Sequence, residues 1–191
     1  MQRTLQRSGL PIWYTQGFHP HPYVTFSLPL SLGFESDYES MDFRLIEQIP
    51  IQEIEKAVSG ALPKGFTLLS AASPCHSPSE IVSADYEIRL LTTSPSELKD
   101  KLESFLKQDS IISEKKTKKG MKEVDLKEEL ISWRLEEDIN DICLYISLPA
   151  GMRMINPLLY LRAFSNLYPN ENFRYNVLRK AIFCEGRELF K

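Results

Sequence analysis

A stretch rich in proline and serine near the middle of the chain, residues 73–83, most constrains how the 191 residues can fold. It reads SPCHSPSEIVS and holds two prolines and four serines. Because proline fixes the backbone and lacks an N–H donor, neither a helix nor a central strand is expected to run through it. We therefore expect two domains, residues 1–72 and 84–191, joined by a linker at residues 73–83.

The second domain has a clear alternation of strand and helix patterns. Ser94 is placed to cap a helix, with Glu97 in the position of a capping box, and Asn156 can cap a second helix. The expected elements are a strand at residues 84–91, a helix at 94–108, a hairpin region, a strand at 141–150, a helix at 156–167 and a strand at 173–185. This is the βαββαβ order of a ferredoxin-like unit.

The first domain repeats this order without its first strand. The patterns predict the end of a helix at residues 1–10, extended chain at 12–18 and 23–30, a strand at 41–47, a helix at 50–62 and a strand at 65–73. The predicted fold class is α+β, with tandem ferredoxin-like (βαββαβ) halves, the first lacking its N-terminal strand. Because a missing central strand exposes backbone groups, we expect the reading frame to extend about 20 residues before Met1.

Composition excludes several classes of protein. Cys75, Cys143 and Cys184 are widely spaced and form no CxxC pair, which argues against a disulfide framework and against a cysteine-held zinc or iron–sulfur site. We expect neither a cofactor nor a metal. The chain has no apolar run of about 18 residues and no signal peptide, so we expect a cytoplasmic protein without membrane contact.

Charge is distributed unevenly along the chain. Residues 1–34 carry Arg3 and Arg7 without any acidic side chain, whereas residues 35–112 carry seven basic and 14 acidic ones. Residues 153–191 carry seven basic and three acidic side chains. If the basic ends meet, they form a face suited to phosphate; otherwise this is the ordinary fluctuation of short segments.

A lysine-rich segment lies between two strand-like flanks. It places Lys115, Lys116, Lys118 and Lys119, followed by Lys122, around Gly120. The segment is either a solvated hairpin tip or an arm whose lysines follow a nucleic-acid backbone.

The densest motif is TQGFHPHP at residues 15–22, with Gly33, Glu35 and Ser36 further along. Glycine permits unusual backbone angles and two prolines restrict the rest, so the loop is preorganised for binding. His19 and His21 project to opposite sides of an extended chain, which argues against a metal pair; either ring could instead cap a turn or bond a carbonyl.

These residues resemble the bacterial radical-SAM-associated proteins, a family of unknown function whose members read Ser-Gln-Gly-Phe-Asn-Pro-His-Pro and then Leu-Pro-Leu-Gly-x-x-Ser. The corresponding segments are TQGFHPHP and LSLGFES, and KEVDL at residues 122–126 is similar to a later element of the family. His19 departs from the family's asparagine, so His21 is the better candidate for a role that requires histidine. The family's Ser-His-Leu-Asp stretch would lie just before Met1.

The resemblance implies a radical SAM enzyme as partner, because this chain lacks the clustered cysteines of that chemistry. Genes of this family often lie next to the genes for ribonuclease G and ribosomal proteins. The leading hypothesis is therefore an accessory or substrate-recognition protein that works with the radical SAM enzyme in the maturation or modification of tRNA or rRNA. Its expected binding residues are Arg3, Arg7, Gln16, Gly17, Phe18, His19, His21, Lys115, Lys116, Lys118 and Lys119.

Two alternatives remain open. In an endoribonuclease-like enzyme, suggested by analogy to CRISPR repeat-processing proteins of tandem ferredoxin-like fold, His21 would be the general acid or base. A protein-only adaptor would bind no RNA. Trp13, Tyr14 and Phe18 could stack on bases or belong to the core.

Overall fold

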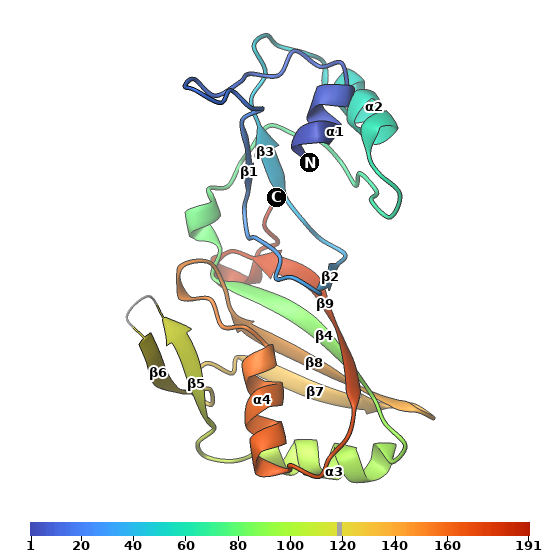
Figure 1. Cartoon of the computed structure of the whole chain (residues 1–191), viewed down its shortest axis with the longest axis vertical. Coiled ribbons are helices and arrows are strands. Elements are labelled where there is room, and N and C mark those ends of the chain that lie inside the picture. The colour runs from blue at the N-terminus through green and yellow to red at the C-terminus, as the bar shows by residue number, and fades with distance from the viewer. Residues whose placement is uncertain (118–119) are drawn as a thin grey trace. The chain divides into compact units, whose positions relative to one another are not determined.

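The computed structural model describes residues 1–117 and 120–191, with the side chains of residues 116 and 117 outside the description. The α+β class is confirmed. The chain forms two compact units (Figure 1). Unit 1 comprises Met1–Pro29, Glu39–Ser77 and Lys191, and unit 2 comprises Leu30–Tyr38 and Pro78–Phe190.

Unit 2 is built around a five-stranded sheet of order β2-β9-β4-β8-β7. Its strands are β2 (Glu35–Ser36), β4 (Ser83–Leu91), β7 (Ser132–Glu137), β8 (Asp141–Pro149) and β9 (Arg174–Phe183). The helices are α3 (Pro95–Leu106) and α4 (Leu158–Leu167). Neighbours among β9, β4, β8 and β7 are antiparallel, while β2 is parallel to β9. Without β2 and the inserted strands β5 (Ile112–Thr117) and β6 (Gly120–Asp125), the chain order is βαββαβ.

The core of unit 2 lies between this sheet and its helices. Alternate residues of β4 are buried, among them Ile88 and Leu90, and α3 contacts both β7 and β8. Phe105 of α3 meets Phe164 of α4 edge to face, with ring centroids 5.5 Å apart. On α3 the helically spaced apolar residues Leu98, Leu102 and Phe105 form the buried face.

The two predicted helix caps differ in outcome. Asn156 Oδ1 accepts a hydrogen bond from the backbone N–H of Leu158 (2.9 Å), although Pro157, one residue later, occupies the N-cap of α4. Ser94 stands at the N-cap of α3 but makes no side-chain cap bond. The Ser94 N–H donates instead to Thr92 Oγ1 (3.3 Å), so the donor that a capping box needs is already used.

The strand-like flanks of the lysine-rich segment form a pair of strands in the expected hairpin region. Strands β5 (Ile112–Thr117) and β6 (Gly120–Asp125) pair with each other in a separate antiparallel sheet. Short 3₁₀ turns also occur, at Pro78–Glu80 (η1), Gly151–Arg153 (η2) and Glu185–Arg187 (η3).

Unit 1 contains two helices and one strand pair. They are α1 (Gln2–Arg7), β1 (Val24–Phe26), β3 (Met41–Phe43) and α2 (Ile51–Ala61). Strands β1 and β3 are antiparallel and α1 packs against α2. Helix α1 ends at Arg7, within the helix end expected at residues 1–10, and Gly9 follows it with a φ of +75°.

The expected strand at residues 65–73 is wrong, since no strand forms in this described segment. The Ala71 N–H donates to the carboxylate of Glu55 (2.9 Å) and not to a neighbouring strand. A strand-like sequence becomes a strand only when a partner offers a ladder of donors and acceptors.

Candidate functional site

The TQGFHPHP motif forms the tip of a narrow hairpin in unit 1. Tyr14 and Pro22 form an antiparallel bridge, and Thr15 N–H donates to the His21 carbonyl (2.9 Å). Further down, Tyr23 N–H donates to the Trp13 carbonyl (3.0 Å). These bonds close a loop, residues 15–21, which we call the 15–21 loop.

Thr15 and His21 make a second set of bonds inside this loop. The His21 N–H donates to Thr15 Oγ1 (3.2 Å), and His21 Nδ1 lies 3.0 Å from the His19 carbonyl and 3.1 Å from Thr15 Oγ1. In the tautomer that carries a proton on Nδ1, this nitrogen donates to the His19 carbonyl, since a carbonyl oxygen only accepts. His21 thus holds the loop's shape by bonding a carbonyl, while His19 contributes its backbone.

Phe18 lies at the apex of the 15–21 loop and is fully exposed to solvent. It is therefore not a core residue. Gly17 just before it has φ of +134°, a conformation that side-chain-bearing residues rarely adopt, so glycine is needed where the chain turns. Gln16 and His19 are also exposed.

An aromatic cluster supports the base of the hairpin. Trp13 meets Tyr23 edge to face at 5.6 Å, and the Arg44 guanidinium lies 5.4 Å from the Trp13 ring centre. The Trp13 N–H also donates to the Arg44 carbonyl (2.8 Å). The sequence analysis did not single out Arg44, because it lies about thirty residues away from the motif. Its place in the strand predicted at residues 41–47 was the only signal that could have suggested a contact with Trp13.

The two N-terminal arginines lie on α1, away from the loop's hydrogen-bond network. Arg3 is exposed beside Val24 and Phe26. Arg7 donates from Nη2 to the carbonyl of Ala61 (3.0 Å) and lines a shallow depression with Lys56. Arg7 thereby satisfies a carbonyl at the end of α2, a bond that fixes its guanidinium in place.

The predicted lysine contacts are only partly described. Lys115 donates from Nζ to the Met154 carbonyl (2.7 Å) and so ties the hairpin to the rest of unit 2. Lys118, Lys119 and the side chain of Lys116 lie outside the described residues.

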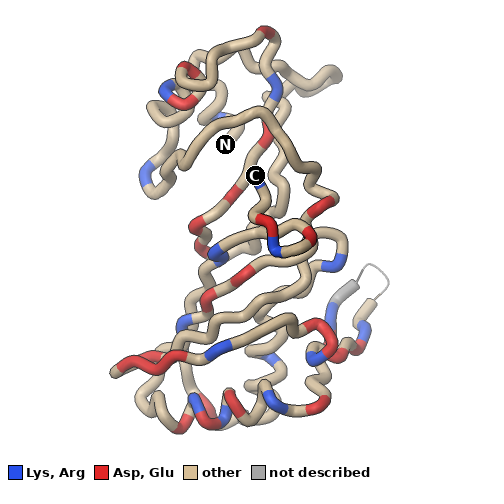
Figure 2. Tube along the Cα trace, turned by 180° about the vertical axis from the view of Figure 1, so that it is seen from behind, with Lys and Arg blue, Asp and Glu red and all other residues tan. Residues whose placement is uncertain are grey.

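The basic C-terminal segment is partly neutralised by ion pairs within unit 2. Arg187 forms a two-bond pair with Asp85 (both 2.9 Å), and Lys180 pairs with Asp37. Arg89 on β4 lies 3.3 Å from Asp141. Figure 2 shows basic and acidic residues interspersed along this sheet, an arrangement unlike a continuous basic face.

The Gly33, Glu35 and Ser36 part of the motif belongs to unit 2, where β2 pairs with β9. Ser36 Oγ donates to the carbonyls of Tyr38 (3.1 Å) and Arg179 (3.3 Å). These bonds anchor β2, so this part of the motif has a structural role.

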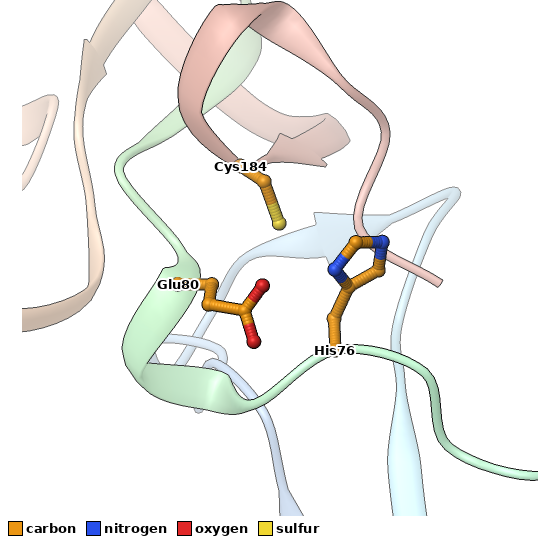
Figure 3. Close-up of side chains that lie close together, drawn as sticks. All are labelled: His76, Glu80 and Cys184. Carbon is orange, nitrogen blue, oxygen red and sulfur yellow. The ribbon is translucent and has the colours of Figure 1, made fainter.

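Two potential metal donors face each other in unit 2. Figure 3 shows Glu80 of η1 and Cys184, which follows β9. Their donor atoms lie within 4.8 Å of each other; His76, also drawn there, belongs to unit 1.

Comparison with known proteins identifies the family. No curated protein and no solved structure matches the chain. No helix in the described residues is both long and apolar enough to cross a membrane. A profile of the family described as "Uncharacterized protein conserved in bacteria (DUF2344)" matches residues 1–157, which include the 15–21 loop and the β5–β6 hairpin. Because the match covers most of its length, the protein belongs to the DUF2344 family of bacteria.

Proposed function

We propose that this protein is an accessory protein that presents structured RNA to a radical SAM enzyme. The observation that carries the proposal is the 15–21 loop, which is closed by hydrogen bonds and places Phe18 fully in solvent. A phenylalanine ring held at the tip of a closed loop offers a large, preorganised aromatic surface to a partner. The radical SAM partner is proposed from the resemblance of TQGFHPHP to the radical-SAM-associated proteins.

The loop is better suited to recognition than to catalysis. His21 uses Nδ1 inside the loop, and among the described residues no carboxylate or second imidazole ring hydrogen-bonds to it. General acid–base catalysis requires a positioned group whose protonation is tuned by such neighbours. A preorganised loop, by contrast, lowers the entropy cost of binding.

RNA is favoured as the substrate by the chemistry of the loop tip. Phe18 offers an open ring face for an unstacked base, while Gln16 offers an amide that can donate to and accept from a base edge. Recognition through stacking suits single-stranded loops and bulges of structured RNA. Arg3 on the same unit is exposed and available to a phosphate.

The finer fold assignment belongs to the same proposal. Unit 2 would be one ferredoxin-like half, a view supported by its βαββαβ order and the strand order β9-β4-β8-β7. Unit 1 would be the αββα part of another, supported by the order α1, β1, β3 and α2. Solving the crystal structure of the chain together with its RNA would test this assignment.

Crosslinking tests the function. The protein is crosslinked in its native cell, and the recovered RNA is sequenced for wild type, Phe18→Ala and Phe66→Ala. Phe66 is an exposed phenylalanine of unit 1 outside the loop and serves as the matched control. Since stacking contributes ~1 to 3 kcal/mol per base, Phe18→Ala should weaken binding of the recovered RNA about five- to 150-fold, and Phe66→Ala should not.

A second arm of the experiment tests the partner. The protein is co-expressed with the radical SAM enzyme of the same genome, and co-purification is measured with and without ribonuclease. If the wild-type protein crosslinks to no RNA but still co-purifies with the radical SAM enzyme, the RNA part of the proposal is wrong and the protein is a protein-only adaptor. Equal RNA recovery by the Phe18 and Phe66 variants would remove the loop from the proposal.

A further inference from the structure

One face of the unit 1 hairpin carries aromatic and basic groups next to the 15–21 loop. Trp13 and Tyr23 lie opposite each other, since the Tyr23 N–H donates to the Trp13 carbonyl (3.0 Å), and their rings meet edge to face with centroids 5.6 Å apart. The Arg44 guanidinium lies 5.4 Å from the centre of the Trp13 ring. We call Trp13, Tyr23 and Arg44 the Trp13 platform.

The platform continues toward the apex of the 15–21 loop. Thr15 comes two residues after Trp13, and His21 comes two residues before Tyr23. Because alternate residues of extended chain share a face, the bonded Thr15–His21 pair extends the face of the platform. The five residues from Phe18 to Tyr23 span at most about 18 Å, a length that a short run of single-stranded nucleotides can cover.

Arg44 is a cation without an acidic partner. Arg153 and Arg187 each form an ion pair with a carboxylate, whereas no carboxylate in the described part of the chain pairs with the exposed Arg44. An arginine that lies over an aromatic ring keeps the N–H groups at the edge of its guanidinium available to other acceptors. Arg44 can therefore donate two parallel hydrogen bonds to a phosphate.

Tyr23 supplies the aromatic surface of the platform. It is 41% exposed, while Trp13 beside it is half-buried. A base can stack on the open part of the Tyr23 ring, as bases do on aromatic side chains that bind single-stranded nucleic acid. Trp13 contacts both Tyr23 and Arg44 and is therefore a positioning residue for the two groups that would meet the RNA.

One acidic side chain limits how the RNA can lie. Asp42 comes two residues before Arg44 on β3 and lies opposite Thr25 in register, so it shares the face of the platform. Because a carboxylate repels phosphate, the RNA should run from Arg44 toward the 15–21 loop and not past Asp42.

We propose that the Trp13 platform binds a second nucleotide of the RNA that meets Phe18, with the base on Tyr23 and the phosphate at Arg44. This inference rests on the RNA-binding role proposed above and adds the class of substrate. The RNA would be a single-stranded loop that presents at least two unstacked bases, since a lone bulged base reaches only one of the two aromatic rings.

Binding of a short RNA to the full chain tests Tyr23. The probe is a fluorescently labelled single-stranded RNA of about ten nucleotides and random sequence, followed by anisotropy. Tyr23→Ala should weaken binding about five- to 150-fold through the loss of one stacked base, whereas Tyr23→Phe should bind nearly as wild type. Tyr14→Ala is the matched control and should bind normally, because Tyr14 is also 41% exposed but, next to Trp13, points to the opposite face.

The dependence of binding on salt tests Arg44. Arg44→Gln removes one phosphate contact and should reduce the slope of log affinity against log salt concentration by about 0.7. Lys64→Gln changes an exposed lysine of unit 1 outside the platform and should leave this slope unchanged. Asp42→Asn should tighten binding about twofold, because it removes a repulsive charge from the same face.

The outcomes separate this inference from the function proposed for Phe18. Circular dichroism verifies that each variant folds. If Phe18→Ala weakens binding and Tyr23→Ala does not, the platform proposal is wrong and the role of the 15–21 loop is unaffected. Equal weakening by Tyr14→Ala and Tyr23→Ala, or a wild-type slope in Arg44→Gln, would also overturn it.

Two further results would overturn the platform proposal. One is tighter binding of an octaglutamate peptide than of the RNA, which would identify an acidic protein segment as the occupant. The other is the absence of RNA binding by the wild-type chain, which would extend to the RNA role of the loop only if crosslinking in the native cell also recovered no RNA.

Discussion

Thr15 and His21 show how few side chains hold the 15–21 loop. Thr15 Oγ1 accepts from the His21 N–H and also lies within hydrogen-bond distance of its ring. Both residues are in the motif, but the sequence alone leaves open whether the imidazole serves chemistry or structure. The contact of His21 Nδ1 with the His19 carbonyl assigns this nitrogen a structural role.

Replacing Thr15 should loosen the loop without unfolding the protein. Thr15→Val removes Oγ1 at nearly constant shape and so removes the hydrogen bonds that it makes. Since a hydrogen bond contributes about 0.5–1.5 kcal/mol, we expect a change of about 1 kcal/mol or less in the free energy of unfolding, with severalfold weaker RNA binding. Urea denaturation and RNA titration measure the two effects, with the exposed Thr25→Val as control. Unchanged RNA binding in Thr15→Val would show that loop rigidity is unimportant.

At the scale of elements, the β5–β6 hairpin is fastened at its base by Asp125. Asp125 Oδ1 accepts from Ile111 N–H (2.8 Å) and Lys127 N–H (2.9 Å), and Leu126 N–H donates to the Ile111 carbonyl (2.8 Å). The bond from Ile111, followed by one from the Ser110 side chain, lowers the pKa of Asp125 below its ordinary value. These bonds join the two ends of an insertion whose lysines the RNA hypothesis needs.

This anchor predicts a pH dependence of stability. Because the pKa of Asp125 is lower in the folded state, its stabilisation is fully present above the ordinary pKa of about 3.9 and is lost as pH falls through the folded value. Asp125→Asn should therefore destabilise the protein near neutral pH and flatten the loss of stability in acid. Urea midpoints measured between about pH 2 and 7 test this. Parallel curves for the variant and wild type would contradict it.

At the scale of the whole molecule, the two units differ in how much apolar surface they bury. In unit 2, β4 and β8 form the centre of the five-stranded sheet and bury residues such as Ile88, Leu90 and Ile142. Unit 1 has a two-stranded sheet and short helices, although Leu5 and Val58 are buried. Elements with fewer buried contacts open at lower free energy.

Hydrogen exchange should reveal this difference directly. Amides of β4 and β8 should exchange most slowly, those of β1 and β3 faster, and those of residues 65–73 fastest among these segments, because the last form no strand ladder. Mass spectrometry of peptic fragments, after exchange at neutral pH, measures all three in one experiment. If β1 and β3 exchanged as slowly as β4, unit 1 would be as stable as unit 2.

The sequence by itself determined the features that depend on neighbours along the chain. The helix expected at residues 94–108 is α3, with Leu98, Leu102 and Phe105 on its buried face, and the strand-like flanks of the lysine-rich segment are the paired strands β5 and β6. Such patterns are reliable because residues three and four apart meet on a helix and alternate residues share a strand face.

Only the tertiary structure decided which groups those elements would meet. Residues 65–73 have a strand-like sequence but form no strand, while Arg7 and Lys115, predicted to contact phosphate, donate to the carbonyls of Ala61 and Met154. A strand forms only beside a second strand that it can hydrogen-bond, and a cationic side chain donates to whichever acceptor lies near it in space. The partner strand and the acceptor both come from residues far away in the sequence. Distant pairing of donors with acceptors leaves no local pattern, so the sequence predicted the elements but not these contacts.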